Sequence, residues 1–460
     1  MGCEREYVVS GDSTQLTFST DTVAFDTVFT SVGSTTQNFR VYNPVQEEVS
    51  IDMIELAGGE ESDFLLNVNG NAGNVITDIS VSGNDSLFVF VEVNVNPTSE
   101  NTPFVISDSI LFYTRDNIYS VHLLAYGQNV IPLRQEVLNT QTLNSDKPYL
   151  IYDWVVVDSA ETLTIDPGTR LYFHNDASLI VFGTLKVMGE VDEPVLFASD
   201  RLDEWYKDKP GQWGYIQLMP NSTDHEIYNA VIRNSTMGLV VDSVGIEKGH
   251  PPLYMNNVKI EHIASQGLIA QNSAIVASNS VFGDCGSASV ALTVGGNYNF
   301  YHCTIANYFS WNYRSMPALV ISNYYSESDG LKSYTLESAN FYNCIIYGKN
   351  DNEIKLDFRN EDEETVTGIA NVSFDYTLVK VRDDVRSAWE DVFGTGVVFN
   401  EDPSFLDPYD FNYQLDSLSV VRDVGALDVA RNFSEDILGN SRIKDKGPDL
   451  GAYERIDKQQ

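Results

Sequence analysis

Residues 279–292 read NSVFGDCGSASVAL, a polar residue leading one short apolar strand, then a glycine-containing turn and a second apolar strand. The leading phrase recurs as Asn229-Ala230-Val231-Ile232, Asn257-Val258-Lys259-Ile260, Asn279-Ser280-Val281-Phe282, His302-Cys303-Thr304-Ile305, Asn343-Cys344-Ile345-Ile346 and Asp375-Tyr376-Thr377-Leu378. The last residues of successive copies are 28, 22, 23, 41 and 32 positions apart. A repeat of about 22 residues that tolerates insertions predicts a coil in which each turn of chain stacks on the one before.

A second apolar strand follows five of these phrases in nearly constant register. These strands begin 7, 8, 8, 14 and 8 positions after the phrase, at Leu239, Leu268, Val290, Leu319 and Ile354. Upstream, residues 161–197 contain similar triplets separated by tight turns, which are too short to pair as hairpins. The pattern therefore predicts a parallel β-helix, which we place at residues 131–400.

The alignment also assigns the interior cysteines. Cys303 and Cys344 occupy the slot held by Ala230, Val258 and Ser280, so we expect them to point into the core in the reduced state. Cys285 is interpreted as a small buried side chain in the same way. The leading Asn229, Asn257, Asn279 and Asn343 predict an asparagine ladder at a turn, a structural rather than a catalytic feature.

Residues 16–130 carry a different pattern. Short period-2 runs such as 87–93 (LFVFVEV) alternate with breaks such as Ala57-Gly58-Gly59 and Asn96-Pro97. About seven such runs predict an antiparallel β-sandwich of the immunoglobulin-like type. No catalytic constellation is visible in this part of the chain.

Three segments resemble known proteins. Residues 166–185 resemble the first turns of right-handed parallel β-helix proteins, and residues 16–130 resemble sandwich modules of bacterial surface proteins. Asp449-Leu450-Gly451-Ala452-Tyr453-Glu454 resembles the closing segment of bacterial right-handed β-helix surface proteins. The resemblance implies an all-β protein: an immunoglobulin-like sandwich, a right-handed parallel β-helix, and a C-terminal capping segment over residues 401–460. We also expect a short amphipathic helix on the flank at residues 383–393.

The charge balance limits the partners. Twenty-eight basic residues against 66 acidic ones give a net charge of −38, which argues against nucleic acid and against an anionic membrane face. No stretch approaches 18 uninterrupted apolar residues, so no membrane-spanning helix is expected.

The N-terminus suggests an anchor. Gly2-Cys3 resembles the end of a bacterial lipobox, which implies that Cys3 is lipidated and that residues 1–15 are an anchor and tether. The preceding signal peptide is not in the sequence, so we expect the chain to begin at the processing point. An accident of cloning is the alternative.

No catalytic residues emerge from the search for chemistry. Arg442-Ile443-Lys444 imitates one motif of pectin hydrolases, but it falls in the capping segment, and His250 lacks paired aspartates on neighbouring coils. The histidines occupy different repeat positions, so we expect neither a metal site nor a cofactor. Calcium is the single candidate ion, at the acidic run 361–364 (EDEE), although such a run is usually a solvated loop.

Aromatic insertions are the candidate contact surfaces, for sugar rings or for another protein. The candidate residues are Trp205, Tyr206, Trp213, Tyr308, Trp311, Tyr313, Tyr324 and Tyr325. The alternative is that they pack back over the side of the coil.

An Asp-Ser or Asp-Thr pair followed by a residue such as Val, Leu, Ile, Ala or Thr is frequent. It resembles a bacterial O-glycosylation motif, although Asp-Ser is also a plain turn former. The candidate acceptors are Ser13, Thr22, Thr27, Ser86, Ser109, Ser159, Ser243 and Ser417.

Three functions remain open. The first is a non-enzymatic surface lipoprotein, anchored in the outer membrane and facing the exterior, that acts as a scaffold or accessory subunit for outer-membrane or other envelope proteins. The second is a polysaccharide lyase or hydrolase, and the third is a glycan-binding or adhesive module. The absence of a catalytic constellation favours the first, and fold alone decides none of them.

Overall fold

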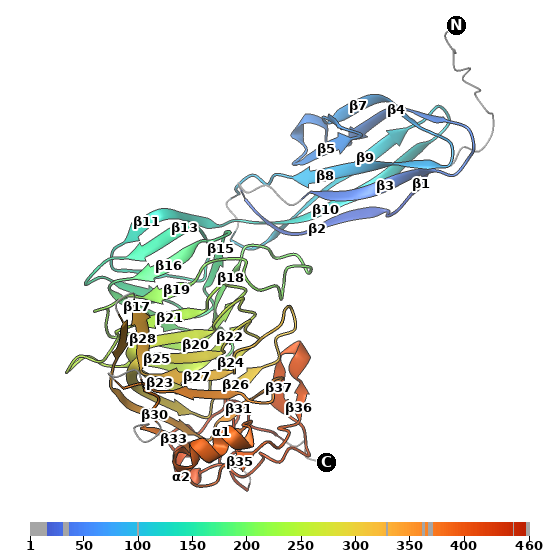
Figure 1. Ribbon diagram of the computed structural model, residues 1–460. Coiled ribbons are helices and arrows are strands. Elements are labelled where there is room, and N and C mark those ends of the chain that lie inside the picture. Colours follow the sequence, from blue (N-terminus) through green and yellow to red (C-terminus); the bar gives the residue numbers. More distant parts are fainter. Residues whose placement is uncertain are drawn as a thin grey trace. The chain divides into compact units, whose positions relative to one another are not determined.

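The computed structural model describes residues 16–30, 36–98, 101–327, 330–360, 364–366, 371–444 and 446–456 (Figure 1). The chain divides into two compact units. One runs to Val130 and includes Leu202–Glu204, and the other comprises Ile131–Arg201 and the chain from Trp205 onward. The protein is all-β apart from short helices.

The first unit is a β-sandwich of two five-stranded sheets. One sheet has the order β1 (Thr17–Phe18), β3 (Gln37–Asn43), β8 (Asp85–Val93), β5 (Phe64–Val68), β6 (Asn71–Ala72). The other has the order β2 (Thr22–Phe29), β10 (Ile118–Gln128), β9 (Phe104–Tyr113), β4 (Val49–Leu56), β7 (Val75–Val81).

Alternation builds this sandwich, as the sequence predicted. In β8 every second side chain, from Leu87 to Val93, is buried between the sheets, and the residues between them face outward. The prediction of purely antiparallel pairing was wrong at one place, because β10 pairs with β2 in parallel. All other pairings within the sandwich are antiparallel among the described residues.

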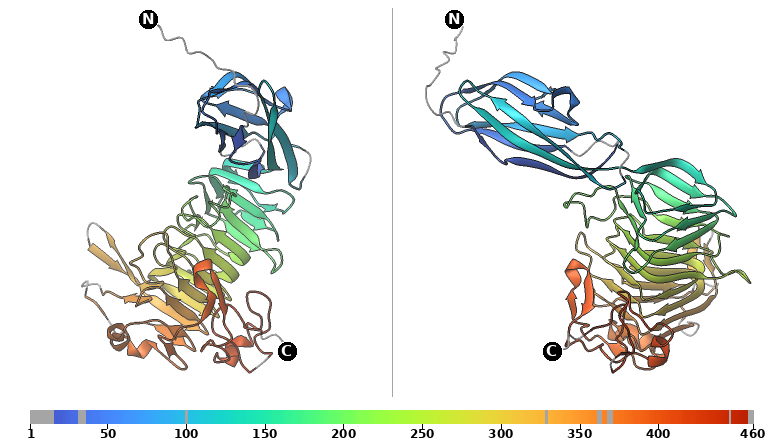
Figure 2. Two further views of the ribbon diagram at one scale, coloured as in Figure 1. Left: turned by 90° about the vertical axis from the view of Figure 1, so that its right-hand side faces the viewer. Right: turned by 180° about the vertical axis from the view of Figure 1, so that it is seen from behind.

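The second unit is a large all-parallel β domain, called the parallel domain below. Its 23-stranded sheet runs from β11 (Ile131–Leu138) to β35 (Val398–Phe399), and each strand pairs in parallel with strands of the neighbouring coils (Figures 1 and 2). Several strands bend at a corner and pair on two sides. The pairings therefore form three stacks, each holding one strand segment from successive coils.

The first of the three stacks contains the recurring phrase of the sequence. It is called the covered stack because residues of the C-terminal part of the chain pack on its outer side. Its members are the first part of β11 and of β13 (Tyr149–Val157), β15 (Arg170–Phe173), β18 (Val195–Ser199), the second part of β20 (Glu226–Arg233) and of β22 (Leu253–Glu261), β24 (Val281–Gly283), β26 (Thr304–Asn307), β31 (Ile345–Gly348), β34 (Leu378–Val379) and β35. The predicted register is confirmed for the first five copies, because Ile232 pairs with Ile260, Ile260 with Phe282, Phe282 with Ile305 and Ile305 with Ile346. It is wrong by one residue at the sixth copy, because Ile346 pairs with Val379 rather than with Leu378. Asp375 pairs with Tyr342, so Tyr376 and not Asp375 takes the leading position there.

The middle stack contains the second predicted strand. It comprises the second part of β11 and of β13, β16 (Ser178–Val181), β19 (Ile216–Leu218), β21 (Leu239–Asp242), the first part of β23 (Leu268–Ser278) and of β25 (Val290–Tyr301), β27 (Leu319–Ser322) and β32 (Ile354–Asp357). Leu239, Leu268, Val290, Leu319 and Ile354 pair in succession, so this register is confirmed as well.

The third stack, called the open stack below, was not predicted from the sequence. It comprises β12 (Gln141–Leu143), β14 (Thr162–Ile165), β17 (Thr184–Met188), the first part of β20 and of β22, the second part of β23 and of β25, β30 (Leu336–Tyr342) and β33 (Val372–Asp375). Each of its later segments ends directly before the residue that leads the recurring phrase, with Tyr376 as the leading residue of the last copy.

The inward side chains of the three stacks form one continuous apolar core. Cys303 and Cys344 are fully buried free thiols in this core, and the backbone N–H of Cys303 lies 3.4 Å from Cys344 Sγ. Cys285 is also buried and free. The inward placement predicted for these cysteines is therefore confirmed.

The leading residues form the corner between the open and the covered stack. Asn229, Asn257, Asn279, His302 and Asn343 all have φ between 47° and 56°, a left-handed conformation that asparagine tolerates better than most residues. The predicted ladder is present only in part: one pair bonds through Asn257 Nδ2 and Asn229 Oδ1 at 2.9 Å. A second contact joins Asn343 Nδ2 to His302 Nε2 at 3.0 Å.

Helix α1 (Asp383–Ala388) and the 3-10 helix η2 (Glu390–Val392) follow the last large coil. The predicted helix is thus confirmed, but it lies at the end of the stacks remote from β11 rather than on the flank (Figure 1). Trp389 and Val392 are buried in the core, and the Trp389 ring lies 5.6 Å from that of Phe358. These side chains close the end of the core.

Residues 401–456, called the C-terminal segment, lie along the side of the covered stack. Their contacts reach three successive coils: Arg442 Nη2 donates to Asn279 Oδ1 at 3.0 Å, Ala452 N–H to Thr304 Oγ1 at 2.9 Å, and Ala426 N–H to Asn343 Oδ1 at 2.7 Å. The segment therefore covers a flank, including outward side chains of β24, β26, β31 and β34.

No helix among the described residues is long and apolar enough to cross a membrane.

Candidate binding groove

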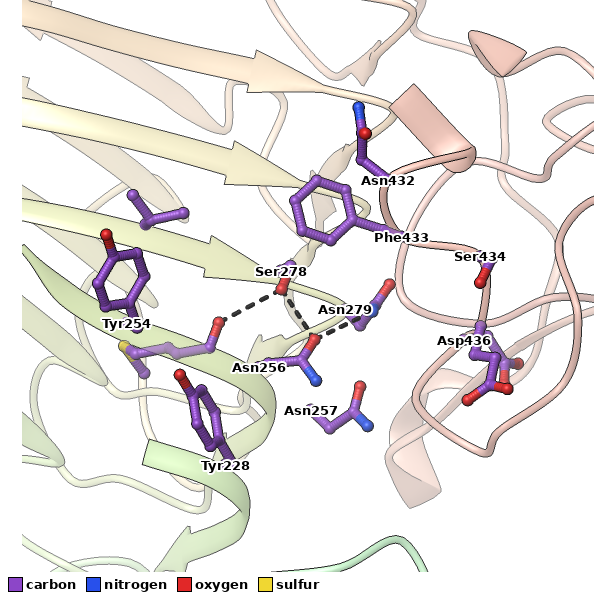
Figure 3. A pocket seen from close by; sticks show the side chains of 13 residues that line it. Tyr228, Tyr254, Asn256, Asn257, Ser278, Asn279, Asn432, Phe433, Ser434 and Asp436 are labelled. Atoms are coloured by element: carbon purple, nitrogen blue, oxygen red, sulfur yellow. Dashed lines mark hydrogen bonds between the residues drawn. The ribbon is translucent and has the colours of Figure 1, made fainter. Parts of the chain in front are cut away.

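A groove of about 490 Å³ lies where the open stack meets the C-terminal segment (Figure 3). Its floor consists of outward side chains of the open stack, and its far wall is a short stretch of the C-terminal segment. The lining residues are Tyr228, Tyr254, Met255, Asn256, Asn257, Val276, Ser278, Asn279, Asn432, Phe433, Ser434, Glu435 and Asp436.

Strand alternation places the floor. In β20 and β22 the apolar Ile227 and Met255 point inward, so the side chains of Tyr228, Tyr254 and Asn256 point outward. Register then brings Tyr228 beside Asn256 on the next coil and Asn256 beside Ser278 on the one after. Tyr254 is 40% exposed, so the groove presents an aromatic ring to solvent.

Hydrogen bonds fix the amides of the floor. Asn256 Oδ1 accepts from Ser278 Oγ at 2.8 Å and from Asn279 Nδ2 at 3.1 Å (Figure 3). Asn257 donates to Asn229, and its Oδ1 is buried without a hydrogen-bond partner among the described residues. Buried polar atoms without a partner are rare, so this oxygen is an acceptor that the fold leaves unused.

The wall is held against the floor by an aromatic contact and a carboxylate. The Phe433 ring stacks on Tyr301 with centroids 4.8 Å apart. The Asp436 carboxylate is fully buried and accepts backbone N–H groups of Leu438, Asn440 and Glu454. Asp436 is therefore a structural anchor that sets the position of the wall.

Electrostatics do not equip the groove for proton transfer. Burial and the neighbouring Glu226 carboxylate raise the pKa of Tyr228 to about 12, so this phenol stays protonated at neutral pH. On the adjoining coil, Lys186 is paired with Glu226 at 2.7 Å and with Asp224 at 3.0 Å. The Tyr228 hydroxyl can serve as a hydrogen-bond group rather than as a base.

The eight aromatic residues predicted as contact surfaces do not lie together in the structure. The prediction was wrong for Trp213, which is fully buried: its ring stacks on Phe173 with centroids 4.1 Å apart, and its Nε1 donates to the Arg233 carbonyl at 2.7 Å. It is a core residue and not a contact surface. Trp205 is exposed, with Lys209 Nζ 3.9 Å from its ring, and Tyr206 is half-buried.

The insertion between β26 and β27 divides its aromatics. Tyr308 packs back, half-buried among Phe405, Tyr409 and Tyr413 of the C-terminal segment, and burial raises its pKa. Trp311 and Tyr313 point away, 51% and 86% exposed. Both alternatives for these loops are therefore realised, at different residues.

Tyr324 and Tyr325 belong to a hairpin of β28 (Tyr324–Glu327) and β29 (Gly330–Ser333). The Tyr324 hydroxyl donates to Asp357 Oδ2 at 3.0 Å, and Tyr325 stacks on Tyr334 with centroids 5.8 Å apart. None of the eight predicted aromatics lines the groove.

Sequence reasoning missed the groove, although a signal was present. With Tyr376 leading the last copy, the residues directly before the leading positions are Tyr228, Asn256, Ser278, Tyr301, Tyr342 and Asp375, all of them polar or aromatic. A column of such residues next to an apolar repeat indicates an outward face. Phe433 offered no comparable signal, because it is far from the repeat in the sequence.

The predicted glycosylation acceptors lie at varied exposures. Thr22, Ser159 and Ser417 are exposed, whereas Thr27, Ser86, Ser109 and Ser243 are half-buried. At four sites the aspartate accepts the backbone N–H of the following residue at 2.7 Å, namely at Thr27, Ser86, Ser109 and Ser159. The aspartates of these four pairs thus have a local structural role. Ser13 lies outside the described residues, as does Cys3.

Within the described ranges, no group of three or more His, Cys, Asp or Glu side chains gathers as a metal site. The acidic run proposed for calcium lies outside the described residues except for Glu364. Arg442, which begins the segment that imitates a pectin-hydrolase motif, has a structural role, because its guanidinium is buried beside Glu454 and Asn279.

Comparison with known proteins assigns no family. No protein-family model matches the chain, and no curated protein matches it. Among solved structures, a PapD-like domain of human CEP192 aligns at 9% identity over 28% of this chain and 96% of that domain, with a TM-score of 0.18. A family 123 glycoside hydrolase from Clostridium perfringens aligns at 7% identity over 26% of each chain, with a TM-score of 0.17.

Proposed function

We propose that the parallel domain binds a glycan chain in the groove and does not cleave it. The observation that carries the proposal is the combination of the Tyr228, Tyr254 and Phe433 rings with the amides of Asn256 and Asn432 in one cavity. Aromatic faces offer apolar area to sugar rings, and fixed amides offer donors and acceptors to hydroxyl groups.

The chemistry of the lining favours binding over cleavage. Hydrolysis requires a pair of carboxyl groups, one of which protonates the leaving oxygen, and a lyase requires a base. Both carboxylate oxygens of Asp436 already accept backbone N–H groups. The raised pKa of Tyr228 means that this phenol does not act as a base. Glu435 is the remaining carboxylate of the lining, and it has no second carboxylate free for the partner role.

Isothermal titration with soluble polysaccharides tests the proposal. Tyr254→Ala and Tyr228→Ala should each weaken binding about tenfold or more, because each removes an aromatic ring that lines the groove. Tyr313→Ala, which removes an exposed tyrosine elsewhere, is the matched control. Reducing ends and unsaturated products should stay at the level of heat-treated protein. Turnover above that level would contradict the non-catalytic assignment.

The finer assignments of fold and location rest on sequence resemblance, and we propose them as such. The sandwich is assigned to the immunoglobulin-like type, and the parallel domain is assigned as a right-handed parallel β-helix. The chain is proposed to be a lipoprotein acylated at Cys3, held in the outer membrane and facing the exterior. Cys3→Ser should release the full-length protein from membranes, and unchanged membrane binding of that variant would refute the anchor.

A second candidate function is docking to an envelope protein, which would make the chain a scaffold or accessory subunit. Exposed Trp311 and Tyr313 favour it, because large exposed aromatics on a fixed loop are typical of protein contacts. The loop is fixed at its base: Arg314 is buried and pairs with both carboxylate oxygens of buried Glu353, at 2.6 and 2.8 Å. Met316 of the same loop packs on Ala291 and Val320.

The middle stack adds apolar surface next to this loop. Its outward positions in register are Ile180, Gln217, Val240, Ile269, Ala291, Val320 and Lys355. A pull-down from native membranes in mild detergent tests this candidate. Tyr313→Ala combined with Trp311→Ala should lose a stoichiometric envelope protein that wild type and Trp205→Ala retain. Equal recovery by all three proteins would argue against docking through this loop.

A further inference from the structure

The groove continues into a strip of polar side chains across the later coils of the open stack. One outward column runs Tyr254, Val276, Asn299, Asn340, Ser373, each residue paired in register with the next. A neighbouring column runs Ser278, Tyr301, Tyr342, Asp375. Every one of these side chains from Asn299 onward is half-buried, so the strip is a packed sheet surface rather than a set of fully exposed groups.

Hydrogen bonds link the strip from coil to coil. Asn340 Nδ2 donates to Asn299 Oδ1 at 3.0 Å, and Ser373 Oγ donates to Asn340 Oδ1 at 3.0 Å. On the adjacent position, Ser338 Oγ donates to Asn297 Oδ1 at 2.8 Å. An asparagine amide has two donor hydrogens and two acceptor lone pairs, so these lateral bonds leave each bridging amide capacity for a ligand.

The same bonds hold the amides in place before any ligand arrives, which lowers the ordering cost of binding. The Tyr301 and Tyr342 rings add an apolar border, stacked with centroids 5.6 Å apart. Adjacent coils are about 4.8 Å apart, so the five positions from Tyr254 to Ser373 span about 19 Å. This length suits an extended chain of several sugar units rather than a single sugar.

We propose that the strip binds the continuation of a linear, uncharged polysaccharide whose first units occupy the groove. This inference rests on the proposed function and adds to it the direction of the ligand, along the stacking axis, and its chemical class. The class includes neutral hexose or pentose polymers and N-acetylated amino-sugar polymers, whose hydroxyl and acetamido groups match amide donors and acceptors.

Charge excludes the acidic polysaccharides. No Lys or Arg occurs among the residues that line the groove or form the two outward columns from Tyr254 and Ser278 onward. Carboxylates do lie beside them: Glu435 lines the groove, Asp375 ends one column, and Glu337 accepts from Asn297. Arg442, which donates to Asn279 of the lining, is fully buried beside Glu454. A uronate or sulfate chain would therefore meet like charge without an accessible counter-ion, within a protein of net charge −38.

The experiment compares ligand class and ligand length by titration calorimetry. The probes are neutral β-glucan, xylan and N-acetylglucosamine oligomers of two and six units, and the acidic probes are polygalacturonate and alginate, with and without calcium. The variants are Tyr254→Ala for the groove, Asn299→Ala and Asn340→Ala for the strip, and Gln217→Ala, outward on the middle stack, as the control.

Wild type should bind a neutral probe more tightly as the oligomer lengthens, and acidic probes at least tenfold more weakly. Asn299→Ala and Asn340→Ala should lose about threefold to tenfold of the affinity for the long oligomer and none for the short one, since each removes hydrogen bonds made only by the longer chain. Asn340→Lys should improve binding of polygalacturonate.

The failures are distinguishable. If Tyr254→Ala abolishes binding while length and the strip variants have no effect, the strip is overturned and the proposed function of the groove stands. If an acidic polymer without calcium binds as tightly as the neutral ones, the assigned class is overturned. If no probe of any class binds wild type, the proposed function falls and the strip with it.

Discussion

Two stacks of the same coil present opposite kinds of outward side chain. On the covered stack, the outward Val281, Ala306, Ile345 and Leu378 are apolar and buried beneath Tyr413, Leu450 and other residues of the C-terminal segment. On the open stack, the outward columns carry tyrosine, asparagine, serine and aspartate besides Val276, and from Asn299 onward they are half-buried, with Phe433 stacked on Tyr301. The inward side chains of both stacks are alike, so the outward columns alone show which flank packs against the C-terminal segment and which keeps polar side chains.

The largest effect is expected from exchanging the two kinds of side chain. Ile345→Asn should lower the free energy of unfolding by about 4–5 kcal/mol, because it removes a buried isoleucine and buries an amide without partners. Asn340→Ile, the reverse exchange on the open stack, should stay within about 1 kcal/mol of wild type. Urea denaturation measures both. A similar loss for both variants would mean that the two flanks do not differ as described.

The next largest effect is expected at Arg442, the buried charge that joins the C-terminal segment to the covered stack. Arg442 is fully buried, donating to Asn279 and the Ala452 carbonyl and lying 3.4 Å from Glu454. Arg442→Ala should cost about 3–4 kcal/mol, because the buried Glu454 carboxylate loses its counter-charge. Arg431→Ala, which breaks an exposed pair with Asp428, should cost about 0–1 kcal/mol in the same denaturation assay. Equal costs would contradict the structural role of Arg442.

The cover should also respond to pH through Asp449. Burial raises the pKa of this carboxyl to about 6, so the folded protein binds its proton more tightly than the unfolded chain does. The stability that it contributes is complete below about pH 4 and is lost as the pH rises through 6, a change of about 2–3 kcal/mol.

The measurement is the difference in unfolding free energy between Asp449→Asn and wild type from pH 4 to 7. The variant should gain on wild type as the pH rises, by that amount. The difference is needed because His225, whose pKa burial lowers to about 4, acts oppositely: its stability contribution is lost as the pH falls from 6.5 through 4. A difference that stays flat would show that Asp449 does not titrate in this window.

The smallest effect is at Tyr413. Its ring is buried among the residues of the cover, and its hydroxyl has no hydrogen-bond partner among the described residues. Tyr413→Phe should therefore leave the midpoint of thermal unfolding unchanged or raise it, a gain within about 1 kcal/mol. A clear loss of stability would reveal a partner for the hydroxyl, and Tyr413→Ala supplies the contrast by emptying the space of the ring.

The sequence predicted two of the three stacks because their strands repeat in nearly fixed register after a recurring polar residue, most often asparagine. The third escaped because the distance from the middle stack to it varies with insertions, as between Asp242 and Leu253. The sandwich was predictable from alternation, but the parallel pairing of β2 with β10 depends on how distant strands meet and leaves no local pattern.

The site was harder to predict than the fold. The floor residues were readable in principle, since Tyr228 and Asn256 directly precede the corner asparagines. The wall was not, because Phe433 reaches Tyr301 from more than one hundred positions away. Aromatic density alone was a poor guide: Trp213 is core, whereas Tyr254 is isolated in the sequence and lines the groove.

The packing of the C-terminal segment on the covered stack has a consequence for the synthesis of the protein. Val281 and Ala306 precede Leu415 and Leu450, which pack over them, by more than one hundred residues. As the chain emerges with its N-terminal end first, from the ribosome or across a membrane, the early coils can stack while their apolar flank still faces water. The emerging chain therefore exposes an apolar stripe of side chains until its last segment follows and packs on them. Synthesis that stops before Leu450 leaves that stripe bare, so truncated products should be the ones that aggregate or engage chaperones.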